Sequence, residues 1–301
     1  MALLEAALRI PEPAAGELRL NEELGPKGRR RVLIATVASV IAIVGGLWWV
    51  YSMLARWRYA PGAVAGDAPI SKGQFEWSLW EPFTQKLLWT KAIWPGVLNT
   101  VRAFGLGLFL ALGIGIVMAT WRAGESKKIR FAAASYTEVF RACALVLLIR
   151  FSFFQLGRSF PSWNSIWMYA FVAVVIGLTL YYSTVFAEVI RSSINSLSVG
   201  QKEAGLAIGM THNQVLRTVI LPQALRRALP NIVTQAASLL KDTSIGYLVT
   251  YPELSYTSDI VKQTFDNSLQ TYFVFWMVYV FLVACVSSIA NRIRKRQDIR
   301  K

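Results

Sequence analysis

The sequence predicts an all-α integral membrane protein with about six transmembrane helices. Of its 301 residues 54% are hydrophobic and only 16% are charged, whereas soluble domains carry about 25% charged residues. The apolar residues are concentrated in long runs, and several runs approach the roughly 20 residues that a helix needs to cross the hydrocarbon core. Basic residues flank these runs, which is the arrangement that membrane topology requires.

The six expected spans cover residues 32–55, 94–121, 138–157, 166–190, 231–250 and 271–290. The first is expected to reach the membrane interface at its carboxyl end, because Trp48, Trp49 and Tyr51 are typical of an aromatic belt. The second is rich in small residues, which let membrane helices approach one another closely. Its glycines are Gly105, Gly107, Gly113 and Gly115.

The distribution of basic residues predicts that both termini are cytoplasmic. With that orientation the cytoplasmic segments hold 21 of the 32 Lys and Arg residues, the outer segments hold seven and the spans hold four. This bias agrees with the positive-inside rule. The chain then consists of a cytoplasmic tail (1–31), an additional first helix (32–55), an extracytoplasmic loop (56–91), a main transmembrane domain (92–290) and a basic cytoplasmic tail (291–301).

Composition argues against several other classes of protein. The formal net charge is +15, but the basic residues flank apolar runs and form no basic face on a soluble module, so nucleic-acid binding is not expected. Cys143 and Cys285 lie in apolar segments, and two isolated cysteines make neither a disulfide framework nor a metal site. The sequence lacks a Gly-Lys dipeptide, so it has no phosphate-binding P-loop. We therefore expect no catalytic residues and no bound cofactor or metal.

The long cytoplasmic loop 191–230, within the main domain, has an unusual pattern. A short helix is expected from Gln201 to Met210, and Gly209 should end it. A second helix is expected to start at Thr211, with Gln214 in the capping-box position. Pro222 should then end or kink that helix.

Two readings of the first short helix are open on these residues alone. Its small side chains, Ala204, Gly205 and Ala207, suit close docking into a groove on another protein, and Glu203 at its start would orient it. The other reading is an amphipathic helix that lies on the lipid surface. The residue pattern by itself favours neither.

The same loop resembles the cytoplasmic signature of ATP-binding-cassette (ABC) importer permeases. That signature reads E-A-A, three residues, G, nine residues, I, one residue, L-P. Val219 and Gly205 stand where the family usually has Ile and Ala, and the spacing is kept throughout. The matching residues are Glu203, Ala204, Gly205, Gly209, Leu221 and Pro222.

The resemblance covers roughly residues 92–295 and is strongest to the polar amino acid branch, most of all to glutamate-importer permeases. It implies the type I ABC importer permease fold in the plasma (inner) membrane. It also implies partners: separate ATPase subunits that bind ATP and Mg²⁺, a second permease subunit, and an extracytoplasmic solute-binding protein. The second subunit is expected to be a paralogue, and a second copy of this chain is the alternative. The helix at Glu203–Gly209 would contact the ATPase. Two departures stand out: Ala144 replaces a usual proline, and Arg150 replaces an apolar residue.

Ionisable residues inside the spans are candidates for the substrate pathway, because an unpaired charge in lipid is costly. Arg102 is expected to snorkel to the interface, and Arg141 is expected to pair with Glu138. Arg150 has no acidic neighbour one turn away, and its planar guanidinium suits a substrate carboxylate. We therefore hypothesise that Arg150 contacts the substrate carboxylate. A polar stripe on the fifth span would line the pathway, with Asp242 as the contact for the substrate ammonium. Its residues are Gln235, Ser238, Asp242 and Thr243.

The sequence therefore predicts a non-enzymatic permease subunit of an ABC importer for polar amino acids, with glutamate or aspartate first and glutamine or a basic amino acid next. A stand-alone secondary transporter or channel is the main alternative, and it predicts inverted repeats. No convincing internal repeat is present. A membrane enzyme would need a catalytic cluster, and His212, the only histidine, lies in the cytoplasmic loop.

Overall fold

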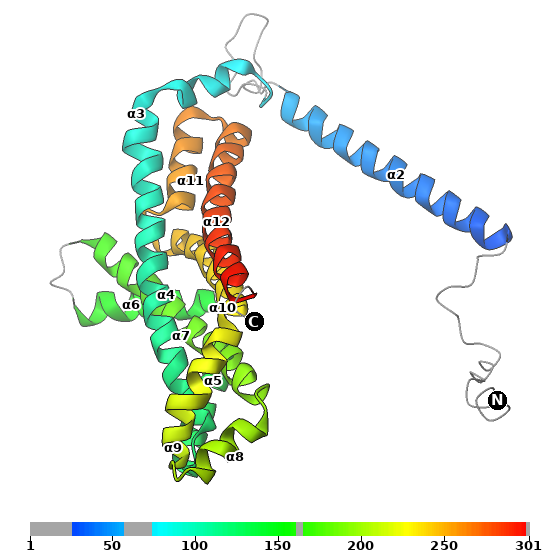
Figure 1. The fold of residues 1–301 in the computed structure, drawn as a ribbon. Coiled ribbons are helices and arrows are strands. Elements are labelled where there is room, and N and C mark those ends of the chain that lie inside the picture. Colours follow the sequence, from blue (N-terminus) through cyan, green and yellow to red (C-terminus); the bar gives the residue numbers. More distant parts are fainter. Residues whose placement is uncertain (1–25, 57–73, 161–164, 299–301) are drawn as a thin grey trace, which may run out of the picture. The chain divides into compact units, whose positions relative to one another are not determined.

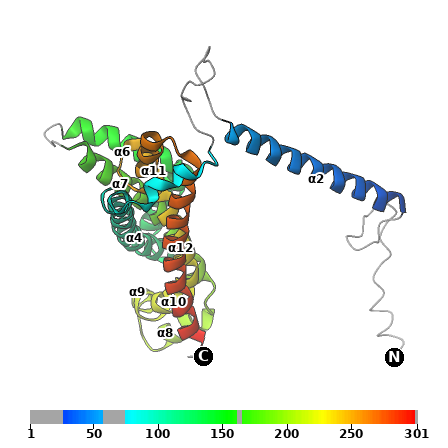
Figure 2. The same cartoon turned by 90° about the horizontal axis from the view of Figure 1, so that it is seen from above.

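The structure is a computed structural model that describes residues 26–56, 74–160 and 165–298, and these ranges contain helices and no strand. The all-α prediction is confirmed. The chain divides into two compact units, Met1–Trp57 and Arg58–Lys301. In the first unit the described element is the single helix α2 (Pro26–Ala55), and every other described helix belongs to the second unit (Figures 1 and 2).

Four described helices are long and apolar enough to cross a membrane. They are α2, α4 (Trp94–Ala123), α7 (Ile166–Asn195) and α12 (Ser268–Asp298). They confirm the expected spans at 32–55, 94–121, 166–190 and 271–290. α12 remains helical beyond its apolar part, so residues 291–298 of the expected basic tail continue the helix.

The core of the second unit is built on α7, and 67% of its most apolar stretch is buried. α4 carries a buried stripe of small residues that recurs every three or four positions; Gly107 and Gly115 pack on α7, whereas Gly96 and Thr100 contact the start of α11 (Leu254–Phe265). The residues of the stripe are Gly96, Thr100, Ala103, Gly107, Ala111, Gly115 and Ala119. Without large side chains on this stripe α4 and α7 approach closely, and dispersion contacts replace the hydrophobic drive that is missing between helices in lipid.

Only half of the glycines expected to serve this packing do so. A Cβ atom on Gly115 would lie 2.8 Å from the Cβ of Phe186, and one on Gly107 would lie 3.5 Å from the Cβ of Leu178. Gly105 and Gly113 have no neighbour within 4 Å of such an atom and face away from α7. The helical period decides this, because residues two positions apart point to different sides of a helix.

The third expected span, 138–157, is wrong as a single straight helix. α5 (Lys127–Ala142) and α6 (Leu145–Ser159) meet at an angle of 97°. Cys143 and Ala144 are both extended, with ψ of 135° and 131°, so the helical hydrogen bonds stop there although no proline is present. A fifth span is counted only if this bent pair crosses the membrane as one unit.

The fifth expected span, 231–250, is also wrong in its limits. α10 (Leu221–Asp242) starts inside the expected loop 191–230 and passes through Pro230 without ending. Its buried stripe of Ala, Ile and Leu packs on α7 and α12, while its other side is polar, and it is not among the four described helices that are long and apolar enough to cross a membrane. Beyond Asp242 the chain forms the 3-10 helix η4 (Thr243–Val249) and then α11 (Leu254–Phe265).

The turn from η4 into α11 is fixed by a fully buried acidic residue. Glu253 is the N-cap of α11, and its carboxylate accepts hydrogen bonds from the backbone N–H groups of Ser255 and Tyr256, both at 2.8 Å. The Tyr279 hydroxyl of α12 donates to the same carboxylate at 2.6 Å. An N-cap acceptor satisfies the otherwise unpaired N–H groups at a helix start. Glu253 therefore joins the start of α11 to α12.

Part of the expected outer loop 56–91 is helical and packed on the second unit. It contains the 3-10 helix η1 (Trp77–Thr84), the short helix α3 (Lys86–Leu88) and the π-helix η2 (Trp89–Ile93), which runs directly into α4. The Asn267 side chain donates to the Leu79 carbonyl at 3.1 Å and ties η1 to the start of α12. Residues 57–73 of that loop, and residues 1–25 of the expected tail 1–31, lie outside the described residues.

The α4–α7 contact predicts opposite effects of two alanine substitutions on the same helix. Gly115→Ala should lower the free energy of unfolding by about 1–3 kcal/mol, the usual range for overpacking, because its Cβ would meet Phe186 and the Ser183 carbonyl. Gly113→Ala should be neutral or slightly stabilising, because alanine has the higher helix propensity and the site is open. Thermal unfolding of the purified chain in detergent measures both. Equal melting temperatures would contradict the proposed packing.

Candidate functional site

The signature residues 203–222 fold into two connected helical pieces at one end of the second unit. α8 (Val199–Ala207) is followed by a turn, by α9 (His212–Gln214) and by the π-helix η3 (Val215–Ile220), which continues into α10. Figure 1 shows α8 and α9 at the end of the bundle opposite α3. The predicted short helix and its successor are both present.

Gly209 ends α8 with backbone geometry that few other residues adopt. Its φ is +85°, in the left-handed region that favours glycine. Its N–H donates to the Leu206 carbonyl at 3.0 Å, and the Met210 N–H donates to the Gly205 carbonyl at 3.2 Å. This pair of bonds is the Schellman motif, which satisfies the last carbonyls of a helix. The signature glycine is therefore required by the turn itself.

Gly205 is required for a different reason. It is the buried residue of α8, and a Cβ atom there would lie 2.7 Å from the Cγ2 of Val215 in η3. The absence of a side chain lets α8 rest directly on η3. The usual family alanine would not fit here unless the β-branched Val215 moved, so the departure at Gly205 matches its neighbour.

The start of the second helical piece, and its passage into α10, follow from particular residues. Thr211 and Gln214 form the predicted capping box, in which each side chain accepts a hydrogen bond from the other residue's backbone N–H. Pro222 stands in the first turn of α10 and does not end the helix, because the wider π-helical turns of η3 lie immediately before it. Leu221 and Val219 are half-buried, and Pro222 is exposed.

One face of α8 is open to solvent. Glu203, Ala204 and Ala207 are exposed, and so are two large apolar side chains nearby, with Val199 68% and Ile208 78% accessible. Glu203 makes no hydrogen bond or ion pair within the described part of the chain. Exposed apolar residues around a short rigid helix are typical of a surface that docks on another protein.

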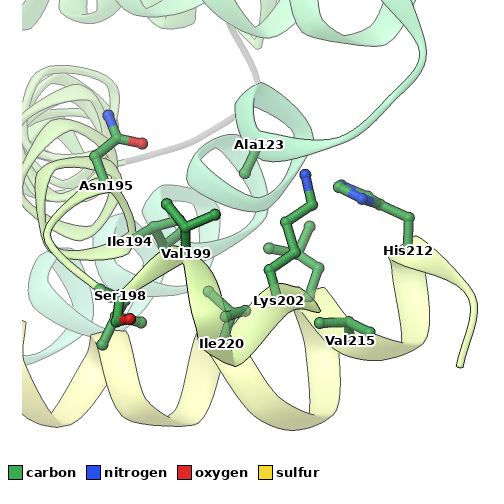
Figure 3. A pocket seen from close by; sticks show the side chains of 11 residues that line it. Ala123, Ile194, Asn195, Ser198, Val199, Lys202, His212, Val215 and Ile220 are labelled. Atoms are coloured by element: carbon green, nitrogen blue, oxygen red, sulfur yellow. The ribbon is translucent and has the colours of Figure 1, made fainter. Parts of the chain in front are cut away.

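A pocket of about 430 Å³ lies behind α8, where it meets the ends of α4 and α7. Figure 3 shows Lys202 and His212 projecting from α8 and α9 on the same side of this pocket. The His212 Nδ1 lies 3.7 Å from the Glu125 carboxylate, in the turn between α4 and α5. Three buried apolar residues that line the same pocket anchor the loop, namely Val215, Leu216 and Ile220.

A network of charges holds the neighbouring helix ends together. The Arg122 guanidinium of α4 donates to the Thr137 hydroxyl of α5 at 2.8 Å and to the Glu188 carboxylate of α7 at 3.3 Å. Glu138 lies 4.0 Å from Arg122, so the expected pair of Glu138 with Arg141 is wrong among the described residues. Residues this far apart in the sequence give no signal of such a network.

The polar stripe on α10 is partly buried, and Asp242 already has a partner. The Tyr182 hydroxyl of α7 donates to the Asp242 carboxylate at 2.7 Å. Thr243 is buried, and its hydroxyl donates to the Leu240 carbonyl. Ser238 and Gln235 are half-buried, one and two turns before Asp242 on α10.

Two residues near Asp242 were missed by the sequence reading. Tyr182 lies in a strongly apolar run, and residue spacing does not indicate that it contacts Asp242 on another helix. Thr179 lies one turn before it on the same face of α7, and its buried hydroxyl oxygen has no hydrogen-bond partner among the described residues. An unsatisfied buried hydroxyl is a polar position inside an otherwise apolar core.

Arg150 lies apart from this cluster. It is exposed on α6, and within the described ranges it forms no hydrogen bond or ion pair. Arg102, in contrast, donates to the Asn99 side chain at 3.3 Å on α4. The described residues contain no group of three or more His, Cys, Asp or Glu side chains that could hold a metal ion.

Comparison with known proteins places these features in a family. Residues 111–300 match the model of the binding-protein-dependent transport system inner membrane component. The chain is 33% identical over 226 residues to a glutamate transport system permease protein of Corynebacterium glutamicum, covering 74% of this chain and 81% of that protein. It is 30% identical over 210 residues to a probable glutamine ABC transporter permease protein of Bacillus subtilis, covering 69% and 93%.

Solved structures show the same architecture. The chain is similar to a chain of an amino acid ABC transporter crystallised with histidines, with a TM-score of 0.63 and 26% identity over 71% of this chain and 98% of that one. It also resembles a chain of an inward-facing MetNI methionine ABC transporter, with a TM-score of 0.57. At 19% identity this second likeness concerns the fold alone.

The contact between α8 and η3 predicts a substitution and its rescue. Gly205→Ala should loosen α8 from η3 and speed cleavage of the loop by a protease, because the new Cβ would overlap Val215. Adding Val215→Ala should restore resistance by removing the overlapping methyl groups. Gly200→Ala is the control, since its nearest neighbour is 3.5 Å away. If the loop of Gly205→Ala were as resistant to the protease as that of the unchanged chain, the contact would be contradicted.

Proposed function

The chain belongs to the family of binding-protein-dependent transport system inner membrane components, and we propose that it carries glutamate or aspartate as the permease subunit of an ABC importer. It is a multi-pass membrane protein with the type I ABC importer permease fold. Such permeases are not enzymes, and ATP is hydrolysed by a separate partner chain. The single observation that carries the assignment as a permease subunit is the family match over residues 111–300.

Glutamate or aspartate is the finer part of the proposal. It is supported by the 33% identity to a glutamate transport system permease protein and by 25% identity to a glutamate/aspartate import permease of Escherichia coli. Permease proteins for glutamine and L-cystine are also similar, at 30% identity each. Glutamine is therefore the second candidate substrate.

The remaining partners follow from the family and are part of the proposal. We infer separate ATPase subunits that bind ATP and Mg²⁺, a second permease subunit and an extracytoplasmic solute-binding protein. The sequence resemblance favours a paralogous second permease, with a second copy of this chain as the alternative. The placement of basic residues supports cytoplasmic termini, and it puts α8 on the cytoplasmic side.

The exposed face of α8 is the proposed contact with the ATPase. Glu203 and Ala204 lie on the open side of α8, while Gly205 seats the other side on η3. Because η3 continues into α10 and α8 follows α7, a push on α8 reaches both helices that hold the Asp242–Tyr182 pair. A rigid connection of this kind supports alternating access, in which ATPase movement opens and closes the pathway.

The polar cluster around Asp242 is the proposed substrate contact. A carboxylate can hold the substrate ammonium, and Thr179, Gln235, Ser238 and Thr243 offer hydrogen-bonding groups on the facing helices. Arg150 remains the proposed contact for a substrate carboxylate. Since it is exposed on α6, we place this contact where the second permease subunit completes the pathway.

Reversal of the charge at Glu203 tests the ATPase contact. Like-charge contacts across an interface cost several kcal/mol, so Glu203→Lys should lower the uptake of labelled glutamate by more than about tenfold. The control is Glu81→Lys, an exposed residue of η1 at the other end of the bundle, which should leave uptake unchanged. Uptake is measured in cells that lack or carry the gene, with equal amounts of the chain in the membrane.

A panel of other labelled amino acids completes that experiment. Loss of glutamate and aspartate uptake on deletion supports the proposed substrate, and loss of glutamine uptake alone supports the second candidate. Full activity of Glu203→Lys would refute the role of α8.

Two substitutions separate a substrate contact at Asp242 from a structural one. Asp242→Asn keeps an acceptor for Tyr182 but removes the charge, so uptake per folded chain should fall by about tenfold or more if the ammonium is bound here. Tyr182→Phe removes only the hydrogen bond and should lower stability more than uptake. Melting temperature and uptake are measured for both. A loss of stability without a loss of specific uptake in Asp242→Asn would leave Asp242 a purely structural role.

In the same assay Arg150→Leu should abolish uptake while assembly is intact.

A further inference from the structure

An apolar groove of about 930 Å³ runs along the face of the second unit between α4 and α12. One wall is formed by η2 and the first half of α4, from Trp89 to Val101, and the other by α12, from Phe273 to Leu282. α11 packs against both helices and keeps them apart. Buried Ile93 and Leu254 belong to the apolar cluster behind it. The groove therefore lies entirely within one unit and is open on its outer side.

The lining of the groove is apolar apart from Thr90 and the indole N–H groups of Trp89 and Trp94. Thr90 supplies its only side-chain hydroxyl, and that hydroxyl already donates to the Lys86 carbonyl one turn earlier at 3.1 Å. Several lining residues are strongly exposed, with Trp94 60%, Phe273 50% and Met277 47% accessible. The occupant that fits such a wall is an apolar chain, since an unpaired polar group would lose its hydrogen bonds there.

The length of the groove matches one leaflet of a bilayer. The twelve steps from Trp89 to Val101 rise roughly 18 Å at about 1.5 Å per residue. Half of the hydrocarbon core is roughly 15 Å thick. Because η2 and α3 are at the end of the bundle opposite α8, this is the leaflet away from the ATPase-facing loop (Figure 1).

Positive charge stands at the upper end of the groove. Lys86 lies one turn before Thr90, at the start of the apolar wall, and Lys91 lies in η2 between the lining residues Thr90 and Ile93. Both lysines are exposed, and among the described residues neither forms an ion pair. The Trp89 indole N–H donates to the Phe83 carbonyl, which fixes a tryptophan at the level typical of the lipid headgroups.

We propose that this groove is a binding site for an anionic phospholipid, whose acyl chains lie between α4 and α12 and whose phosphate contacts Lys86 and Lys91. The apolar wall and the paired lysines fit the two ends of one amphiphilic molecule. Lysine near an anionic headgroup adds to binding, and two such residues distinguish an anionic from a zwitterionic lipid. The site lies outside the coupling loop and outside the Asp242 cluster, so it goes beyond the proposed transport function.

Site-specific quenching by lipids with brominated acyl chains tests the proposal on the full chain in vesicles. Cys143 and Cys285 are replaced by serine, and a fluorophore is attached to Met277→Cys inside the groove. A second preparation carries it on Phe109→Cys, a 73% exposed lipid-facing position of α4 outside the groove. The vesicles are phosphatidylcholine with increasing fractions of brominated phosphatidylglycerol or brominated phosphatidylcholine. Melting temperatures confirm that each variant is folded.

The expected result is half-maximal quenching of the Met277→Cys probe at a fraction of brominated phosphatidylglycerol about tenfold lower than for brominated phosphatidylcholine. The Phe109→Cys probe should respond equally to both lipids. Lys86→Gln with Lys91→Gln should abolish the preference at Met277→Cys, and Lys86→Arg with Lys91→Arg should retain it.

Three results would overturn the proposal. Equal quenching of the Met277→Cys probe by both lipids would mean that the groove holds ordinary surrounding lipid. An unchanged preference in the double glutamine variant would remove the lysines from the site. Protection of the Met277→Cys probe from both lipids, with disulfide cross-linking between unlabelled Met277→Cys chains, would assign the groove to a second copy of the protein.

Discussion

The close approach of α4 and α7 is the contact on which the rest of the second unit depends. In lipid the hydrophobic effect does not drive one helix onto another, so van der Waals packing must hold them together. The stripe of small residues that includes Gly107 and Gly115 brings α4 against Leu178 and Phe186. α7 thereby becomes the buried centre on which α6 and α10 also pack. The Arg122–Glu188 pair closes one end of the same contact by joining the two helices through charge.

The signature residues 203–222 also form an ordered structure, at one end of the second unit. Gly209 turns the chain with a left-handed backbone, and Gly205 lets α8 seat on Val215. The capping box at Thr211 and the π-helix η3 then lead into α10. Gly205, Gly209 and Thr211 thus have local structural roles, and Glu203 and Ala204 are exposed on α8. η3 continues directly into α10, and α8 follows α7 along the chain.

Buried polar groups mark the places where the helical bundle departs from simple packing. Tyr182 and Asp242 bind each other across α7 and α10, and Glu253 caps α11 while it holds Tyr279 of α12. The unsatisfied Thr179 hydroxyl belongs to the residue one turn before Tyr182 on α7. Buried polar groups are costly unless they are satisfied, so each constrains the position of the helices that it joins. The groove between α4 and α12 is apolar along its walls, and Lys86 and Lys91 lie near its η2 end.

The sequence by itself determined the properties that depend on local composition and spacing. These are the helical class, the apolar spans at 32–55, 94–121, 166–190 and 271–290, the capping box, the turn at Gly209 and the family. Tertiary structure decided the rest. Hydrophobicity alone could not show that Cys143 and Ala144 break one apolar run at 97°, nor that α10 starts at Leu221 and carries a polar side opposite its buried stripe. Period and composition say which residues can be buried, but not which helix covers them. The partners of Asp242, Gly115 and Gly205 were therefore fixed only when residues distant in the sequence packed together.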